Sequence, residues 1–447
     1  MYRNITNKLV EWKNNSRRKP LLISGARQTG KTFIIKEFGK RYYEDVIEAN
    51  FEKDGELKAI FDRSLKPSNI VTDLENYYGR RIYPKKTLIF FDEIQSCPAA
   101  VTAMKYFYED ANDYHVIGAG SLLGVAISRN FSNKSFSFPV GKVDSLRLYP
   151  MNFEEFLIAL NENLLLETIK NCYINNESMS ELLHGKALKL YRDYLVIGGM
   201  PEAVQEYIDT GSYIASTTIV NRIYDDYLSD TAKYSTGNEA IKNKSCYDTI
   251  AKQLLKTNKN FKYSEVLKGK NAQYFGSSID WLVNAGIGLK SLLLDQTSLP
   301  LIFHTNDFLF RIYLSDVGLF RHKANLRISN ILDIDYRDDM TGILAENYVA
   351  CELSSYGIPL YYWTGKEDAE IEFMVEYNNC CTPFEVKAGK RVTSKSLDVY
   401  RRTHKVEFVF RASQKNYGIA DGIKSVPLYA VFCIAKDIVN NQSENIV

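Results

Sequence analysis

The stretch Ile23-Ser24-Gly25-Ala26-Arg27-Gln28-Thr29-Gly30-Lys31-Thr32 decides the fold of this chain of 447 residues. Gly25 and Gly30 bracket the spacing Gly-x-x-x-x-Gly-Lys-Ser/Thr. Residues 20–23 before the loop are predicted to form a short buried strand, and residues 33–38 after it to begin a helix. This order of strand, glycine-rich loop and helix is the context that a phosphate-binding loop requires.

The residue types of the loop suit an anion. Glycines permit a tight turn that points successive backbone N–H groups inward, and the N-terminus of the following helix adds a partial positive charge. Lys31 is predicted to reach the β- and γ-phosphates of a nucleotide, and the Thr32 hydroxyl to bind Mg²⁺. The expected nucleotide-binding residues are Gly25, Ala26, Arg27, Gln28, Thr29, Gly30, Lys31 and Thr32.

A second motif supplies two carboxylates. The apolar run 88–91 ends in Asp92 and Glu93, as a central parallel strand does when it presents acids at its C-terminal end. Asp92 is predicted to hold Mg²⁺, directly or through water, and Glu93 to orient and deprotonate the attacking water. Alone, this pair would indicate a helix N-cap with an acid in its first turn. Its position at the end of a core strand favours the nucleotide site.

Composition excludes several classes of protein. Hydrophobic content of 45% and charged content of 25% are typical of globular chains, and this length predicts about two to four domains. No stretch approaches the roughly 20 apolar residues of a membrane span, and residues 1–4 open no signal peptide. The cysteines and histidines lack metal-ligand spacing. We therefore expect a cytoplasmic protein with reduced thiols and no membrane partner.

The first third of the chain alternates strand-like and helix-like segments, which predicts a parallel sheet covered on both faces. Ser121 follows the last of these strands. It is either a sensor that contacts the γ-phosphate or the attacking water, or part of an ordinary strand-to-loop turn. The expected strands are 21–24, 45–51, 88–91 and 115–118, with a helix over 99–109 between the last two.

The middle of the chain is predicted to be helical from residue 154 to about residue 234, after an N-cap at Asn152 with Glu155 three positions later. From residue 245 to 320 the order of elements becomes that of a winged helix. The segments are helices at 246–256 and 274–285, followed by strand-like pieces at 288–294 and 299–305.

Residues 252–270 of this winged-helix-like segment carry six lysines against one glutamate, so one face should be basic. Three interpretations are open: a surface that binds DNA or RNA, a solvated face, and a winged helix used only for packing.

A second group of acids lies near the C-terminus. Glu346 is in a predicted helix, Glu372 in a strand at 369–375, and Glu385 in a strand at 383–387. Alternation places Glu370 with Glu372 on one face, and Glu385 with Lys387 on one face of the next strand. The 13 positions from Glu372 to Glu385 suffice for a hairpin that brings these faces together.

Three carboxylates and a lysine suit metal-assisted phosphodiester cleavage. The acids Glu346, Glu372 and Glu385 would hold a hard divalent cation, and Lys387 would activate water or steady the phosphate. A basic run from residue 387 to 405 follows, which suits a phosphate backbone. The interpretations are an active cleavage centre, a nuclease-like fold without activity, and a structural hairpin with Glu–Lys cross-strand pairs.

These motifs together resemble a large prokaryotic family of AAA-type ATPases fused to a C-terminal domain of unknown function that looks like the restriction-endonuclease (PD-(D/E)xK) fold. The resemblance covers nearly the whole chain and implies ATP binding and hydrolysis, a winged-helix segment and a nuclease-like tail. The stretches that carry it are 25–32, 91–95, 137–143, 148–157, 194–204 and 385–389.

Two positions depart from that family. It usually has arginine where Lys142 stands; if that arginine is a finger towards a neighbouring subunit's γ-phosphate, lysine lacks its planar fork. Arg129 or Arg147 would then be the finger instead. The family usually has aspartate where Glu372 stands, and the extra methylene displaces the carboxylate, which argues against cleavage.

The expected fold class is α/β, in four parts: an N-terminal P-loop NTPase (AAA-type) parallel sheet at 1–160, a helical lid or linker at 161–240, a winged-helix-like segment at 241–325, and a C-terminal α/β nuclease-like domain at 330–447. The leading hypothesis is an ATPase with ATP and Mg²⁺ as cofactors that couples hydrolysis to conformational change in the nuclease-like module. DNA or RNA and a homo-oligomer are the candidate partners. The alternatives are an ATP-gated metal-dependent nuclease and a non-catalytic ATP switch that recruits a protein partner.

Overall fold

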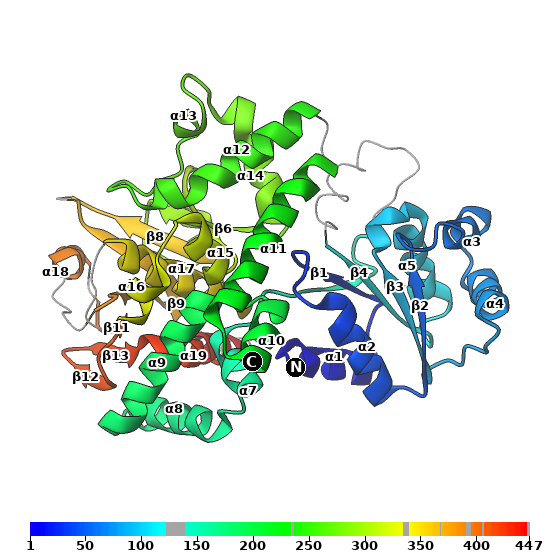
Figure 1. The fold of residues 1–447 in the computed structure, drawn as a ribbon, viewed down its shortest axis with the longest axis horizontal. Helices are drawn as coiled ribbons and strands as arrows, with labels where there is room; N and C mark the ends of the chain where they lie inside the picture. Colours follow the sequence, from blue (N-terminus) through cyan, green and yellow to red (C-terminus); the bar gives the residue numbers. More distant parts are fainter. Residues whose placement is uncertain are drawn as a thin grey trace. The chain divides into compact units, whose positions relative to one another are not determined.

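The computed structural model describes residues 1–121, 139–233, 237–333, 339–366, 368–389, 395–404 and 406–444. The chain forms two compact units (Figure 1). The first comprises Met1–Tyr149 with Asn284–Gly286, and the second Pro150–Val283 with Ile287–Val447. Each unit contains its own sheet.

The first unit is built on a five-stranded sheet with the order β2-β3-β4-β1-β5. All neighbouring strands are parallel. β4 therefore lies between β1, which leads into the phosphate-binding loop, and β3, which ends in Asp92. The strands are β1 (Leu21–Ser24), β2 (Asp45–Asn50), β3 (Thr87–Asp92), β4 (His115–Gly120) and β5 (Asp144–Arg147).

Helices cover both faces of this sheet, as predicted. Because side chains alternate along β3, Leu88 and Phe90 pack with residues of α1 and α2, whereas Ile89 and Phe91 pack with residues of α3, α4 and α5. The carboxyl ends of the strands are thus held by two separate apolar cores. The helices are α1 (Ile5–Asn14), α2 (Lys31–Tyr42), α3 (Leu57–Arg63), α4 (Pro67–Tyr78) and α5 (Pro98–Asp110), with a 3₁₀ turn η1 (Ile94–Ser96) after β3.

The second unit begins with the predicted helical region. Asn152 caps its first helix in a capping box with Glu155, as the sequence indicates. The helices are α7 (Phe153–Ala159), α8 (Asn163–Asn175), α9 (Glu181–Ile197), α10 (Pro201–Thr210), α11 (Tyr213–Lys233), α12 (Gly237–Leu254), α13 (Tyr263–Val266) and α14 (Ala272–Asn284).

Two glycines join α9 to α10 at a point of close packing. Gly199 N donates to Asp316 Oδ2 at 2.6 Å, and Gly199 O accepts from Met151 N at 2.7 Å. A Cβ on Gly199 would lie 2.0 Å from Met151 O, so no larger residue fits. This break in the helical region is therefore a structural junction.

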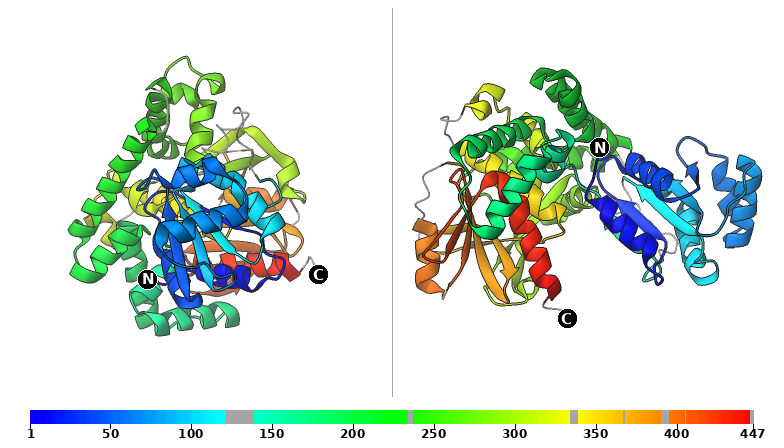
Figure 2. Two further views of the ribbon diagram at one scale, coloured as in Figure 1. Left: turned by 90° about the vertical axis from the view of Figure 1, so that its right-hand side faces the viewer. Right: turned by 90° about the horizontal axis from the view of Figure 1, so that it is seen from below.

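An eight-stranded mixed sheet completes the second unit, in the order β12-β13-β11-β10-β9-β8-β6-β7. α19 packs against β9 and α17 (Figure 2). The strands are β6 (Gly288–Leu294), β7 (Thr305–Leu314), β8 (Leu360–Thr364), β9 (Glu370–Tyr377), β10 (Cys380–Val386), β11 (Val409–Ser413), β12 (Gly418–Ala420) and β13 (Ile423–Pro427). The remaining elements are α15 (Val317–Lys323), α16 (Ile328–Leu332), α17 (Asp339–Ser355), α18 (Lys395–Thr403), α19 (Val431–Glu444) and the 3₁₀ turns η2 (Leu301–His304) and η3 (Leu428–Ala430).

The winged-helix-like segment differs from expectation in two respects. The predicted strand at 299–305 is wrong: Leu301–His304 is a 3₁₀ turn, and β7 begins at Thr305. The hairpin of β6 and β7 is also not a separate wing, because β6 pairs in parallel with β8 from Ser291 to Leu293. Such a pairing joins segments about 70 residues apart, so local periodicity does not reveal it.

The structure also divides the chain differently from the boundaries expected at residues 160 and 325. The first unit ends at Tyr149 rather than at residue 160. The reason lies in α7, whose Phe153 packs edge-on against the rings of Tyr191 and Tyr194 in α9. Helix α7 therefore belongs to the second unit.

Candidate functional site

The phosphate-binding loop connects β1 to α2 and depends on both of its glycines. Gly25, Gln28 and Gly30 have φ of 151°, 62° and 89°, so three residues of the loop adopt a positive φ, which glycine tolerates best. A Cβ on Gly25 would lie 2.2 Å from Leu148 O, because the chain leaving β5 crosses close to it. Any other residue at Gly25 would push these segments apart.

Lys31 is folded back over the loop. Its ammonium donates to Gly25 O at 3.0 Å and to Ala26 O at 2.7 Å, and the residue is only 7% exposed. Burial lowers the pKa of Lys31 to about 8, although Glu93 and Asp92 oppose the shift. A poorly hydrated ammonium held over a glycine-rich turn is suited to phosphate oxygens.

Thr32 and Asp92 face each other at the carboxyl edge of the sheet. Thr32 Oγ1 lies 3.2 Å from Asp92 Oδ1 and 3.1 Å from Oδ2. Burial raises the pKa of Asp92, and the neighbouring Glu93 adds to the rise. A hydroxyl and a carboxylate are the hard oxygen donors that Mg²⁺ takes beside a nucleotide, so these two residues fit the ion.

Asn50 is a residue of this site that the sequence interpretation missed. It ends β2 in register with Asp92, and its Nδ2 donates to Asp92 Oδ2 at 2.9 Å. The amide thereby fixes the orientation of the carboxylate. The sequence feature that could have identified Asn50 is a polar residue close to the end of the strand predicted at 45–51.

Glu93 is held by two neighbours. Its carboxylate accepts hydrogen bonds from Gln95 Nε2 and, at 3.4 Å, from Ser121 Oγ. Ser121 follows β4, the strand between β1 and β3, and is 2% exposed. The predicted sensor thus contacts the residue predicted to orient water, and Gln95 is a second support that the sequence interpretation missed.

Two of the candidate finger residues lie at opposite ends of the edge strand β5. Lys142 precedes β5 and pairs with Glu109 at 3.1 Å, whereas Arg147 ends β5 in register with Ser24, next to the loop. Arg129 lies outside the described residues.

In the second unit, two of the three acids predicted to hold a cation, Glu346 and Glu372, come together with Glu370, whereas the third predicted acid, Glu385, is not part of this group. One carboxylate oxygen from each of Glu346, Glu370 and Glu372 lies within 4.8 Å of the others. Lys387 Nζ lies 3.3 Å from Glu385 Oε1 and 3.8 Å from Glu372 Oε1. The hairpin of β9 and β10 therefore brings together the two faces that alternation predicted.

Three further cations neutralise this cluster, and none of them had a local sequence signal. Lys259 Nζ lies 2.6 Å from Glu346 Oε1 and 2.9 Å from Glu370 Oε1. Arg311 binds both oxygens of Glu370, at 3.0 and 2.7 Å, and Arg411 Nε lies 2.6 Å from Glu385 Oε2. With Lys387, four cations balance four carboxylates.

Burial shapes the ionisation of the cluster. It raises the pKa of Glu372 to about 7, although Lys387 acts in the opposite direction. Burial alone would lower the pKa of Lys259, but Glu346 and Glu370 raise it above its ordinary value. The ammonium of Lys259 is therefore a permanent positive charge among these acids.

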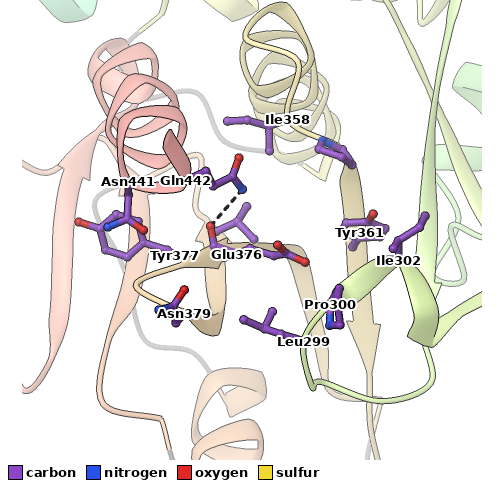
Figure 3. A pocket seen from close by; sticks show the side chains of 12 residues that line it. Leu299, Pro300, Ile302, Ile358, Tyr361, Glu376, Tyr377, Asn379, Asn441 and Gln442 are labelled. Carbon is purple, nitrogen blue, oxygen red and sulfur yellow. Dashed lines mark hydrogen bonds between the residues drawn. The ribbon is translucent and has the colours of Figure 1, made fainter. Parts of the chain in front are cut away.

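A separate hollow of about 540 Å³ opens in the second unit (Figure 3). Its walls are mainly apolar, with Leu299, Pro300, Ile302 and Tyr361 on one side. Among the described residues that line it, Glu376 is the one acid, and its carboxylate accepts a hydrogen bond from Leu301 N at 2.8 Å.

A glycine-rich loop between strand and helix, opposite an Asp-Glu pair at the end of a neighbouring strand, defines a P-loop NTPase. More specifically, residues 17–157 match the protein family described as AAA domain, so the N-terminal part of the chain is an AAA-type P-loop ATPase domain. Residues 188–330 and 341–431 match two families described as domains of unknown function, DUF8612 and DUF4143.

Solved structures share parts of this architecture at low identity. A Walker-type ATPase of Pyrococcus abyssi is 14% identical, covering 72% of this chain and 94% of its own, with a TM-score of 0.42. The Aeropyrum pernix ORC1 protein in complex with DNA is 12% identical; the match covers 74% of this chain and 90% of that one, with a TM-score of 0.23. AMPPCP-bound DnaA from Aquifex aeolicus is 18% identical; the match covers 62% of this chain and 88% of that one, with a TM-score of 0.24.

No curated protein matches the chain. Of the helices in the described ranges, none combines the length and the apolar character needed to cross a membrane.

Proposed function

We propose that the chain is a Mg²⁺-dependent ATPase that couples ATP hydrolysis to a conformational change in its C-terminal half. The observation that carries the proposal is the arrangement at the carboxyl edge of the first sheet. Thr32 and Asp92 face each other at 3.1 to 3.2 Å, while Gln95 and Ser121 hold the adjacent Glu93. Metal donors and a positioned carboxylate thus lie side by side.

Each residue has a distinct role in this proposal. Lys31 exchanges its two backbone carbonyl partners for phosphate oxygens, and the loop N–H groups bind the same anion. Thr32 and Asp92 hold Mg²⁺, which neutralises charge on the phosphates. Glu93 orients the attacking water and takes up its proton, and Ser121 keeps that carboxylate in place.

The test is steady-state ATP hydrolysis by the full chain. Glu93→Gln should lower kcat by about 100-fold or more, because a general base contributes on that order, while fluorescent ATP analogues still bind. Glu37→Gln is the matched control, since Glu37 is exposed on α2 and pairs there with Lys40 at 3.2 Å. Wild-type turnover in Glu93→Gln would reject the proposal. Tight ATP binding without turnover in the wild type would favour the switch that recruits a protein partner.

Nucleic acid is the second candidate ligand, on a specific observation. Lys242 and Lys270 place their ammonium groups 3.7 and 4.5 Å from the ring centre of Tyr274, and Lys268 and Lys270 are exposed. A basic aromatic patch suits a phosphate backbone and a stacked base. Of the six lysines counted in the sequence, Lys259 is not on this face, because it is buried against the acids.

The same ATPase assay tests this candidate when it is run with and without mixed DNA and RNA at low salt. Turnover that rises with nucleic acid in the wild type, and less so in a Lys268→Ala, Lys270→Ala double variant, would support it. Lys256→Ala is the matched control, because Lys256 pairs with Glu265 at 2.6 Å. If the rate of ATP hydrolysis by the wild type did not change when DNA and RNA were added, nucleic acid would be rejected as a ligand.

A further inference from the structure

The carboxylate cluster of the second unit has the geometry of a cation site. One oxygen each from Glu346, Glu370 and Glu372 lies within 4.8 Å of the others, so a single ion between them would reach all three. Glu346 Oε2 is also buried and accepts no hydrogen bond from any described residue, although Glu346 is only 6% exposed. The cluster therefore retains acceptor capacity that the surrounding side chains do not use.

A cation of the chain already stands among these acids. Lys259 Nζ contacts Glu346 at 2.6 Å and Glu370 at 2.9 Å. A divalent ion bound to the same oxygens would lie within a few ångströms of this ammonium, in surroundings poor in water. Like charges so close repel strongly, and the ion would have to displace Lys259 to bind.

Contacts on both sides of Lys259 fix its position. The preceding Asn258 accepts from Asn260 N at 3.0 Å, and Asn260 Oδ1 accepts from Tyr362 OH of β8 at 2.7 Å. Phe261 N donates to Phe310 O of β7 at 2.8 Å, and the two rings stack. The segment that carries Lys259 is thus anchored to two strands of the sheet, β7 and β8.

We infer that Lys259 is a built-in cation that takes the place of a divalent metal among Glu346, Glu370 and Glu372 and keeps the nuclease-like centre closed to metal. Together with Arg311 and Lys387, it balances the three carboxylates. Without Lys259, the three carboxylates and the two remaining cations would carry one net negative charge. The space between Glu346 and Glu370 that the Lys259 ammonium occupies would be vacant. This inference concerns metal binding alone and is independent of the proposed ATPase activity.

The test compares Mn²⁺ binding by the full chain without nucleotide, measured from the loss of the free-ion electron paramagnetic resonance signal. Lys259→Met keeps the length of the side chain and removes its charge. It should bind one more Mn²⁺ per chain than the wild type, with affinity at least about tenfold tighter than any wild-type binding at the cluster. Adding Glu372→Gln to this variant should abolish the gain.

Lys256→Met is the control, since Lys256 lies three residues away and pairs with Glu265 instead. A folded Lys259→Met protein that binds no more Mn²⁺ than the wild type would overturn the inference. The inference would also be overturned if the wild type bound Mn²⁺ and the single variant Glu372→Gln did not. That result would show that metal enters the cluster while Lys259 is in place. This second comparison decides the matter even where Lys259→Met fails to fold, and ATP binding by the first unit reports on integrity.

Discussion

Asp92 is the residue on which the first site depends, because four other residues are arranged around it. Thr32 faces its two oxygens, and Asn50 donates to Oδ2. Glu93 helps to raise the pKa of Asp92, and Asp92 in turn acts to raise the pKa of Lys31. A carboxylate that binds metal well needs a fixed orientation, and a neighbouring hydrogen-bond donor supplies it.

Asn50→Ala should therefore weaken the binding of Mg²⁺ more than the binding of ATP. We expect the Mg²⁺ concentration for half-maximal ATPase activity to rise about tenfold, because such supporting donors typically contribute ten- to a hundredfold in metal affinity. Asn69→Ala, which removes only a hydrogen bond to Ser64, is the control. A Mg²⁺ dependence unchanged from wild type would show that Asp92 keeps its orientation without Asn50.

The residues of the two candidate sites differ in how far a local sequence pattern predicts their arrangement. Lys31, Thr32, Asp92 and Glu93 stand in contiguous motifs whose spacing carries the chemistry, so they could be named in advance. Lys259 and Arg311 lie 87 and 59 positions from their partners Glu346 and Glu370, and only the folded sheet brings them together. No local pattern marks an ion pair of that kind.

At the scale of elements, buried strands were easier to predict than exposed ones. β3 is buried at every position, and its continuous apolar run predicted the strand to within a residue at each end. The apolar run at 299–303 was misleading, because Ile302 and Phe303 are 56% and 80% exposed in a 3₁₀ turn. Hydrophobicity alone does not distinguish a buried strand from an exposed turn.

Helix α17 gives an element-scale prediction on pH. Its Glu352 is fully buried, and one carboxylate oxygen accepts from Phe153 N at the start of α7 at 2.7 Å. Burial raises the pKa of Glu352 to about 8. Since the ordinary value is 4.5, the folded state holds this proton more tightly than the unfolded state.

The stability that Glu352 contributes is thus fully present below pH 4.5 and is lost as pH rises towards 8. Glu352→Gln, which imitates the protonated form, should flatten this part of the pH dependence and raise the melting temperature at pH 9 by roughly 5 °C. Thermal unfolding between pH 5 and 9 measures it, with the exposed Glu167→Gln on α8 as control. If the melting temperatures of the wild type and Glu352→Gln changed in parallel with pH, Glu352 would not be the group responsible for the pH dependence.

At the scale of the whole molecule, the eight-stranded sheet joins parts of the chain that match different families. β6 and β7 fall within the match at 188–330, and β8 to β13 within the match at 341–431. The two are connected by backbone pairing of β6 with β8 and by Asn347 of α17, which exchanges two hydrogen bonds of 2.9 Å with the backbone of Leu314 in β7.

A fragment of residues 330–447, the domain that sequence patterns delimit, should therefore not fold alone. It would expose the edge of β8, leave the fully buried Asn347 without its partners, and leave Glu370 without Arg311 and Lys259. Each buried polar group left unpaired costs about 1–3 kcal/mol, a large share of the stability of a small domain.

The fragment 150–447, which contains the whole sheet, is the matched comparison. We expect it to unfold cooperatively in urea, as followed by circular dichroism, while 330–447 shows no cooperative transition. A cooperative transition in 330–447 would mean that β8 to β13 form an independent domain and that β6 and β7 only attach to it. Because Lys259 and Arg311 reach the acids from outside 330–447, a fragment that folded would also present a cluster with fewer cations, which Mn²⁺ binding would reveal.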